Sequence, residues 1–191
     1  LSACTAGPFY QSDFVIAHRG APLGYPEHTA EGYTAAANMG AGFIECDVTF
    51  TQDGELVCRH SQCDLHRTTN ILTTTLAQKC RVPFTPATTD SDAKAVCCTS
   101  DLSLQEFQSL CGRPDHVNKR AAEITGYLSS PRSRVDTQPV QCGTLQTLKE
   151  NITFIEALGA KHVPELKAPM VPMPHNGMSQ QTYADRLIQA Y

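Results

Sequence analysis

The sequence predicts an α/β fold built on a parallel β-sheet. Short apolar runs typical of strands alternate along the chain with segments of helical periodicity, which is the order expected when helices connect parallel strands. The 191 residues are 41% hydrophobic and 18% charged, a composition typical of one globular domain. Only three candidate sheet strands remain when the return strand of a single hairpin is left out. The sheet is therefore either small and open, or it continues in residues that this chain does not contain.

The first predicted elements are a strand and a helix. Residues 14–17 form a short apolar run that is typical of a buried strand, and the polar run 18–20 closes it. Thr29 has the side chain of a helix cap, and the helix is expected over 29–39 with Gly40 as its stop.

A hairpin is expected next. Strands at 43–51 and 55–60 flank Asp53-Gly54, a strong two-residue turn signal. With a two-residue turn, counting outward places Asp47 opposite His60, where directly opposed Cβ atoms lie about 4.5–5.5 Å apart. A three-residue turn would displace this pairing by one position.

The rest of the chain divides into two parts. Residues 64–140 hold threonine-rich and proline-rich patches and one helical stretch at 102–110, which indicates a disulfide-tied excursion on the surface. Regular structure returns with a predicted helix over 145–158, a strand over 162–167 and a helix over 179–191.

Nine cysteines are scattered along the chain, and none has the paired CxxC spacing of a zinc site. They are Cys4, Cys46, Cys58, Cys63, Cys80, Cys97, Cys98, Cys111 and Cys142. This usage predicts disulfides and a secreted, extracellular protein, with one cysteine left over; reduced cysteines in a cytosolic core are the alternative. The triplet Asn151-Ile152-Thr153 is a glycosylation sequon and points the same way.

The net charge of −4 and the pI of about 5.9 argue against a nucleic-acid partner, because phosphate binding on that scale needs a basic face. No apolar run approaches the roughly 20 residues that cross a bilayer, so no transmembrane segment is expected. The start of the chain has neither a basic nor an apolar leader region, and we interpret this as a signal peptide already removed, although a cytosolic protein would look the same.

Polar side chains gather at the ends of the predicted strands. His18 and Arg19 follow the first strand. Glu45 and Asp47 are two residues apart on the second strand, so both carboxylates point to the same face. Two like charges this close are costly unless a cation or a proton bridges them, and hard oxygen ligands suit Mg²⁺ or Ca²⁺.

The last strand adds a third carboxylate, Glu165, and a cation, Lys167, again two residues apart. The sequence thus offers His18 and His60 for general acid and base work, and Arg19 with Lys167 for an anion. Together with a bound metal, this set fits the cleavage of a phosphodiester.

Short motifs carry these residues in a fixed order. They are His18-Arg19-Gly20, Pro26-Glu27-His28-Thr29 with Gly32-Tyr33, Glu45-Cys46-Asp47-Val48, Thr51-Gln52-Asp53-Gly54, Val57-x-x-His60, Arg67-Thr68-Thr69-Asn70 and Glu165-Leu166-Lys167. In order and spacing they resemble the glycerophosphodiester phosphodiesterase family. The resemblance is dense over 14–70 and returns at 144–170.

The resemblance implies a TIM (β/α)8 barrel with its active site at the carboxyl ends of the strands. A barrel of this kind needs about 250 residues. Residues 1–191 would therefore supply the N-terminal part of one phosphodiesterase barrel domain, with 64–140 as a cysteine-rich insertion. A second polypeptide is expected to complete the barrel.

The implied reaction is metal-dependent hydrolysis of glycerophosphodiesters to glycerol 3-phosphate and an alcohol. The implied roles are His18 and His60 as the acid/base pair, Glu45, Asp47 and Glu165 as ligands of one Mg²⁺ or Ca²⁺, Arg19 and Lys167 as phosphate-binding residues, and Glu27 as a supporting residue. Attack by water and attack by the glycerol hydroxyl of the substrate, through a cyclic phosphate, both fit.

One departure from the family and two other functions remain open. Many members have Asp after the second histidine, where this chain has Ser61, and Asp64 is a candidate replacement. One alternative function is phospholipase D-like cleavage of lysophospholipid or sphingomyelin, which would need an apolar rim. The other is a secreted binding protein that has lost catalysis, against which the retained histidines and carboxylates count.

Overall fold

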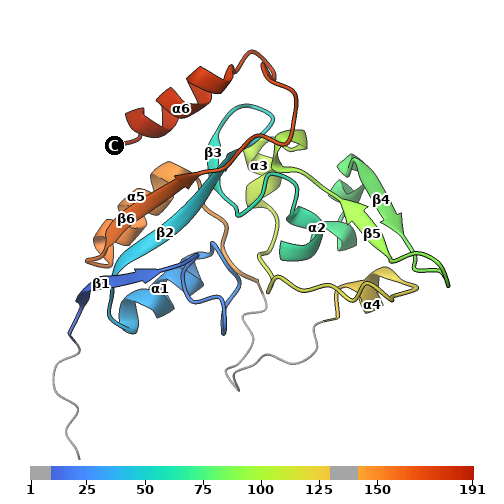
Figure 1. The fold of residues 1–191 in the computed structure, drawn as a ribbon, viewed down its shortest axis with the longest axis horizontal. Helices are drawn as coiled ribbons and strands as arrows, with labels where there is room; N and C mark the ends of the chain where they lie inside the picture. The colour runs from blue at the N-terminus through green and yellow to red at the C-terminus, as the bar shows by residue number, and fades with distance from the viewer. Residues whose placement is uncertain (1–9, 130–141) are drawn as a thin grey trace, which may run out of the picture.

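The computed structural model describes residues 10–129 and 142–191, and its central feature is a mixed sheet of four strands. The strands are β1 (Ser12–Ala17), β2 (Ala41–Phe50), β3 (Leu56–Cys58) and β6 (Lys161–Leu166). β1 and β6 run parallel to β2 on its two sides, and β3 returns antiparallel along β2 (Figure 1). Val48 pairs with both β3 and β6, so β3 continues the β1 side of the sheet. The described residues form an open sheet with β1 and β6 at its edges.

Three helices accompany the sheet, and each begins at a hydroxyl cap, of which Thr29 was predicted. They are α1 (Ala30–Asn38), α5 (Leu148–Ala157) and α6 (Gln180–Gln189), capped by the side chains of Thr29, Thr147 and Ser179. Gly40 and Gly159 follow α1 and α5 with positive φ, the backbone conformation that lets a helix stop and reverse. The predicted start of α5 was two to three residues early, because Thr147 and Glu150 together form a capping box.

Side chains of β2 alternate between a helix-covered face and a polar face. Val48 and Phe50 pack with Tyr183 of α6 in an apolar cluster. Glu45 and Asp47 lie at the intervening positions and therefore point to the opposite face. Because side chains alternate along β2, one face of the strand packs in the apolar core and the opposite face carries the two carboxylates.

The hairpin between β2 and β3 differs from the predicted one by one residue. Its loop is the three-residue segment 52–54, and Gly54 adopts φ +82°, as this loop class requires. Arg59 rather than His60 therefore lies opposite Asp47, with its N–H 2.8 Å from the Asp47 carbonyl oxygen. The two-residue turn was wrong, and the three-residue alternative holds. His60 consequently lies in the loop that follows β3.

Residues 64–129 lie to one side of the sheet (Figure 1). Their apolar side chains, among them Leu65, Phe107 and Tyr127, form a hydrophobic cluster that also includes Val57 and Leu145. Their elements are α2 (Leu65–Thr68), β4 (Val82–Thr85), β5 (Lys94–Val96), α3 (Leu104–Gln108), α4 (Ile124–Tyr127) and the 3₁₀ turns η1 (Ile71–Thr73), η2 (Thr75–Lys79) and η3 (Thr99–Asp101). The helix predicted at 102–110 corresponds to α3, whereas the β4–β5 hairpin was not predicted.

Eight cysteines form disulfides, in agreement with the sequence prediction. The pairs are Cys46–Cys58, Cys63–Cys98, Cys80–Cys97 and Cys111–Cys142. Cys4 lies outside the described residues. Within the described ranges, no helix has both the length and the apolar character needed to cross a membrane.

The sequon residue Asn151 is buried in the structure, and its glycosylation stays a prediction. Its side chain is buried on α5, where Nδ2 donates to Gln146 Oε1 at 2.8 Å. Its Oδ1 lies 2.8 Å from Nε2 of His162, whose other ring nitrogen contacts the Tyr191 hydroxyl. Both ends of the Asn151 amide are thus used in hydrogen bonds within the fold.

The partly buried His162 predicts a pH-dependent contribution to stability. Burial lowers the pKa of His162 to about 4, below the value near 6.5 of an unfolded chain. Between these values the unfolded state binds a proton that the folded state excludes, so the contribution of His162 is present above pH 6.5 and is lost as pH falls toward 4. The difference in free energy of unfolding between the wild type and His162→Gln should shrink on acidification, by at most about 1.4 kcal/mol per pH unit. Urea denaturation at pH 7.0, 5.5 and 4.5 measures this, and a pH-independent difference would contradict it.

Candidate active site

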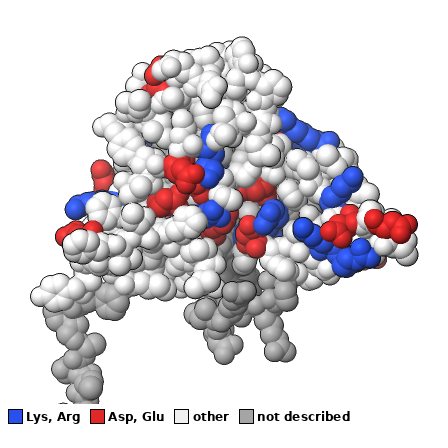
Figure 2. Space-filling model, in the orientation of Figure 1, with Lys and Arg blue, Asp and Glu red and all other residues white. Residues whose placement is uncertain are grey.

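Charged side chains gather at the carboxyl ends of the three parallel strands. Figure 2 shows acidic and basic side chains side by side in the middle of this face, over the region where Figure 1 places the ends of β1, β2 and β6. The ion pairs there are Arg19–Glu27, Arg19–Asp47, Lys167–Asp47 and Lys167–Glu165. The predicted strand-end cluster of charges therefore exists in the folded chain.

The turn after β1 directs Arg19 into this cluster. Arg19 and Gly20 both have positive φ, and a Cβ on Gly20 would lie 3.0 Å from the backbone of α1. In this conformation the Arg19 N–H donates to Glu45 Oε2 at 2.7 Å. The guanidinium lies 3.2 Å from Asp47 through Nε and 3.2 Å from Glu27 through Nη1. One residue thus contacts three carboxylates, one of them through its backbone.

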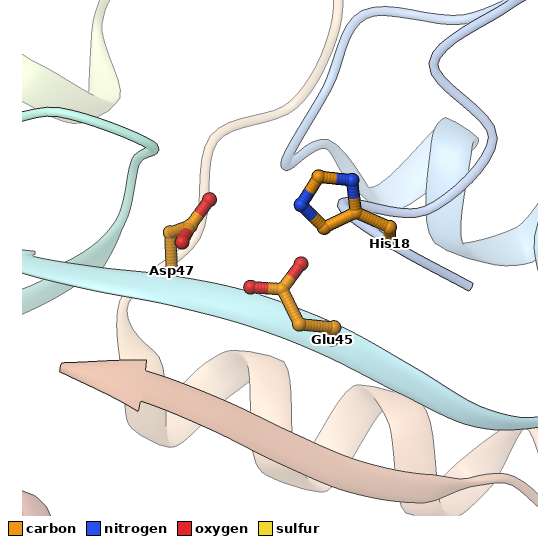
Figure 3. A group of neighbouring side chains, drawn as sticks. All are labelled: His18, Glu45 and Asp47. Atoms are coloured by element: carbon orange, nitrogen blue, oxygen red, sulfur yellow. The ribbon is translucent and has the colours of Figure 1, made fainter. Parts of the chain in front are cut away.

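His18, Glu45 and Asp47 converge on one point (Figure 3). Each offers one ligand atom, and the three atoms lie within 4.8 Å of one another. Oε1 of Glu45 is buried and has no hydrogen-bond partner, and Oδ1 of Asp47 is buried with Lys167 Nζ 3.2 Å away. A buried carboxylate oxygen without a partner is a suitable donor for a hard cation, so these residues fit an Mg²⁺ or Ca²⁺ site.

The two carboxylates differ in their affinity for a proton. Burial, reinforced by the negative charge of Asp47, raises the pKa of Glu45 to about 7. Burial alone would raise the pKa of Asp47 as well, but the hydrogen bonds and charges of His28 and Lys167 hold it well below its usual range. Asp47 is therefore the permanently ionised member of the pair.

Glu165 lies beside Asp47 but turns toward Lys167. The two residues are register partners across β6 and β2, and Lys167 Nζ lies 2.7 Å from Glu165 Oε1 and 3.2 Å from Asp47 Oδ1. The Glu165 side chain is 56% exposed and does not belong to the group around His18. Its role as a third metal ligand stays a prediction.

His60 belongs to a second group, with Glu27 and Asp64. Ligand atoms of these three residues also lie within 4.8 Å of one another. Asp64 is buried, its Oδ2 accepts from the Ser61 N–H at 3.0 Å, and burial raises its pKa to about 6. Burial and the charge of Arg19 lower the pKa of His60. The structure thus places the candidate replacement, Asp64, next to the histidine that it was expected to serve.

Two buried residues of the site were assigned no role by sequence reasoning. His28 lies 2.9 Å from Asp47 through Nε2 and 3.0 Å from the Tyr33 hydroxyl through Nδ1, and burial lowers its pKa to about 4. Arg59 is fully buried and donates from Nη2 to the Glu27 carbonyl oxygen at 2.5 Å. The only sequence signal for His28 was its place in the motif after Glu27, and Arg59 carried none beyond its position before His60.

The sequence of this chain is similar to those of known proteins. Residues 18–187 match the sequence model of the glycerophosphoryl diester phosphodiesterase family. The chain belongs to this family. The matched range contains every residue of the two groups described above, which agrees with the family resemblance of the motifs.

Individual relatives align over part of their length. A probable glycerophosphodiester phosphodiesterase 1 of Mycobacterium tuberculosis is 49% identical over 69 residues, 34% of this chain and 25% of that protein. An extracellular protein of Arthroderma benhamiae is 42% identical over 79 residues, 40% of this chain and 32% of that protein.

A solved phosphodiesterase of Oleispira antarctica, in complex with the product sn-glycerol-3-phosphate, has 22% identity and a TM-score of 0.53, over 92% of this chain and 52% of that one. This likeness supports the same fold for the described residues. The chain spans about half the length of that family member.

Proposed function

We propose that the protein containing this chain hydrolyses glycerophosphodiesters to glycerol 3-phosphate and an alcohol, with the help of a divalent cation. The observation that carries the proposal is the convergence of His18, Glu45 and Asp47 at the strand ends of a member of this family. The names of the Mycobacterium and Oleispira relatives describe the same reaction and its product.

The carboxylates are proposed as ligands of one Mg²⁺ or Ca²⁺. Glu45 and Asp47 would supply buried oxygens, that of Asp47 in exchange for its pairing with Lys167, and Glu165 would join them by turning away from Lys167. A bound divalent cation supplies positive charge that stabilises the negative charge developing on the phosphoryl oxygens. Arg19 and Lys167 add positive charge at the same place, and Glu27 orients Arg19.

The two histidines are proposed to move the protons. His60 has a lowered pKa and is neutral near pH 7, which fits a base that takes the proton from the attacking oxygen of water or of the glycerol hydroxyl. His18 then donates a proton to the oxygen of the leaving alcohol. Asp64, close to His60, is proposed to orient its ring in place of the aspartate that many relatives carry.

We also propose that further strands, from a second polypeptide, extend the open sheet and close it into a barrel. The edge strand β1 exposes apolar side chains, with Phe14 97% and Ile16 58% exposed. Ile16 pairs with Phe43 and shares its face, which a closed barrel would fill with side chains. In this arrangement the chain is the N-terminal part of one barrel, and 64–140 is a disulfide-tied insertion.

An extracellular location is proposed on the basis of the disulfides. Four disulfides persist in an oxidising compartment and are rare in reducing ones. The Arthroderma relative is named an extracellular protein, which supports the same location.

The test of the proposed function is an assay of the protein expressed from its complete coding sequence. We expect release of glycerol 3-phosphate from glycerophosphocholine, loss of this release with a chelator, and recovery with Mg²⁺ or Ca²⁺. Lysophosphatidylcholine serves as the second substrate, and choline released from it alone would favour the lipid-cleaving alternative. A cyclic phosphate among the products would indicate attack by the glycerol hydroxyl. No turnover of either substrate would overturn the proposal, and the 191-residue chain by itself should be inactive.

A further inference from the structure

Three buried side chains form a line of hydrogen bonds that ends on Asp47. The Tyr33 hydroxyl lies 3.0 Å from Nδ1 of His28, and Nε2 of His28 lies 2.9 Å from Oδ2 of Asp47. None of the three side chains is exposed. We infer that His28, held by Tyr33, is a positioning residue that fixes the orientation in which Asp47 presents its carboxylate to a divalent cation.

The chemistry of the three groups assigns the hydrogens along this line. A carboxylate can only accept, and a neutral imidazole has one donor and one acceptor nitrogen. Nε2 of His28 therefore carries the hydrogen that Asp47 accepts, and Nδ1 accepts from the Tyr33 hydroxyl. Tyr33 thus selects the one tautomer in which His28 can hold Asp47. Without the hydroxyl, the ring could bind its hydrogen on Nδ1 and leave Asp47 without this donor.

The backbone of His28 is held in one conformation by its neighbours. Its φ of +54° is in the left-handed region, which few residues other than glycine adopt, so the surrounding structure must hold it there. Its N–H donates to the Arg19 carbonyl oxygen at 3.2 Å, and the next residue, Thr29, caps α1. The ring is therefore fixed to the β1 turn and to α1 and spans to β2.

The two carboxylate oxygens of Asp47 have different neighbours. Oδ2 receives His28 at 2.9 Å and lies 3.2 Å from Arg19 Nε. Oδ1 is paired with Lys167 Nζ, which lies 3.2 Å away. His28 therefore holds one oxygen, and a cation would bind the other in place of Lys167. Groups that orient a metal ligand in this way typically change metal affinity or activity by about 10- to 100-fold when they are lost.

This inference rests on the proposed function only in taking Asp47 as a cation ligand. The test therefore measures binding as well as turnover. In the protein expressed from its complete coding sequence, His28→Phe fills the same space without a donor, His28→Gln keeps a donor, and Tyr33→Phe removes only the hydroxyl. Calorimetric titration with Mn²⁺ or Ca²⁺ gives the affinity, and circular dichroism reports whether each variant is folded.

We expect His28→Phe to weaken cation affinity at least about tenfold, Tyr33→Phe to weaken it several-fold, and His28→Gln to restore most of it. The chain offers matched controls, because Tyr191 and His162 form a second tyrosine–histidine pair. His162 is hydrogen-bonded to Asn151 of α5 and is the register partner of Ile44, so it lies on the sheet face opposite Glu45 and Asp47. His162→Phe and Tyr191→Phe should leave cation affinity unchanged.

Wild-type affinity in a folded Tyr33→Phe or His28→Phe protein would overturn the inference, whether or not the protein hydrolyses glycerophosphodiesters. If His28→Phe fails to fold, Tyr33→Phe alone decides. Weakened binding in the site variants and the controls alike would indicate a general loss of stability and would also overturn the inference. A wild-type protein that binds the cation but hydrolyses nothing would contradict the proposed function and leave this test intact.

Discussion

Replacing His18 by alanine is expected to lower the rate of glycerophosphodiester hydrolysis by about a hundred- to ten-thousandfold, the usual contribution of a general acid or base. His18 converges with Glu45 and Asp47, so it could act on the substrate or bind the cation. The proposed role as the acid predicts that kcat falls while cation affinity stays within about twofold of the wild type. Steady-state kinetics and calorimetry on the same preparation measure both quantities.

The companion variant is His60→Ala, which should lose a similar factor and also change the pH profile. Because burial and the charge of Arg19 lower the pKa of His60, the activity of the wild type should fall on acidification at a pH below the usual histidine value, and this limb should disappear in the variant. His116→Ala, in the segment between α3 and α4, is the control and should keep full activity. A His18→Ala protein with normal kcat would remove His18 from the mechanism, and one that binds the cation more than tenfold less tightly would make it a ligand.

Asp47→Asn should have the largest effect on cation binding. Asp47 is the carboxylate that stays ionised, and three basic side chains face it, those of Arg19, His28 and Lys167. Loss of its charge should weaken cation affinity by more than about a hundredfold, since loss of a supporting group alone costs 10- to 100-fold. Hydrolysis should fall at least as much. Titration calorimetry and the glycerol 3-phosphate assay report the two effects.

The same substitution should lower stability in the absence of the cation. Arg19 and Lys167 are about one-fifth exposed and would lose their shared counter-charge. We expect a loss on the order of 2 kcal/mol, below the 3–5 kcal/mol found when a fully buried pair is broken. Asp101→Asn breaks the Arg81–Asp101 pair away from the site, so it controls for the loss of an ion pair. If the two variants lost the same stability and both kept cation affinity, Asp47 would be a structural residue only.

The local elements could be predicted because their signals are local. Thr29, Thr147 and Ser179 each cap a helix through contacts within three or four residues, and the alternation of β2 follows from the strand period of two. The convergence of His18 with Glu45 and Asp47 followed from the same reasoning, since parallel strands end at one edge of a sheet.

Sequence patterns were insufficient where the folded structure determines the conformation, the burial or the partners of a residue. The hairpin register depended on whether the turn had two or three residues, and the φ of Gly54 settles this only in the folded chain. Asn151 has a glycosylation sequon, but α5 buries it against Gln146 and His162. His28 and Arg59 acquire their roles through partners 19 and 32 residues away, so no local pattern marks them.

The Cys46–Cys58 disulfide lies on the helix-covered face of the sheet, directly beneath the reactive side chains. Cys46 lies between Glu45 and Asp47 on β2, and Cys58 is the last residue of β3, directly before Arg59. A covalent bond therefore joins the strand that bears the carboxylates to the strand that leads to His60. The arrangement of the site therefore depends on whether the chain folds under conditions that allow this disulfide to form. A chain made under reducing conditions would have to hold β3 against β2 with only the short ladder of 48–50 against 56–58.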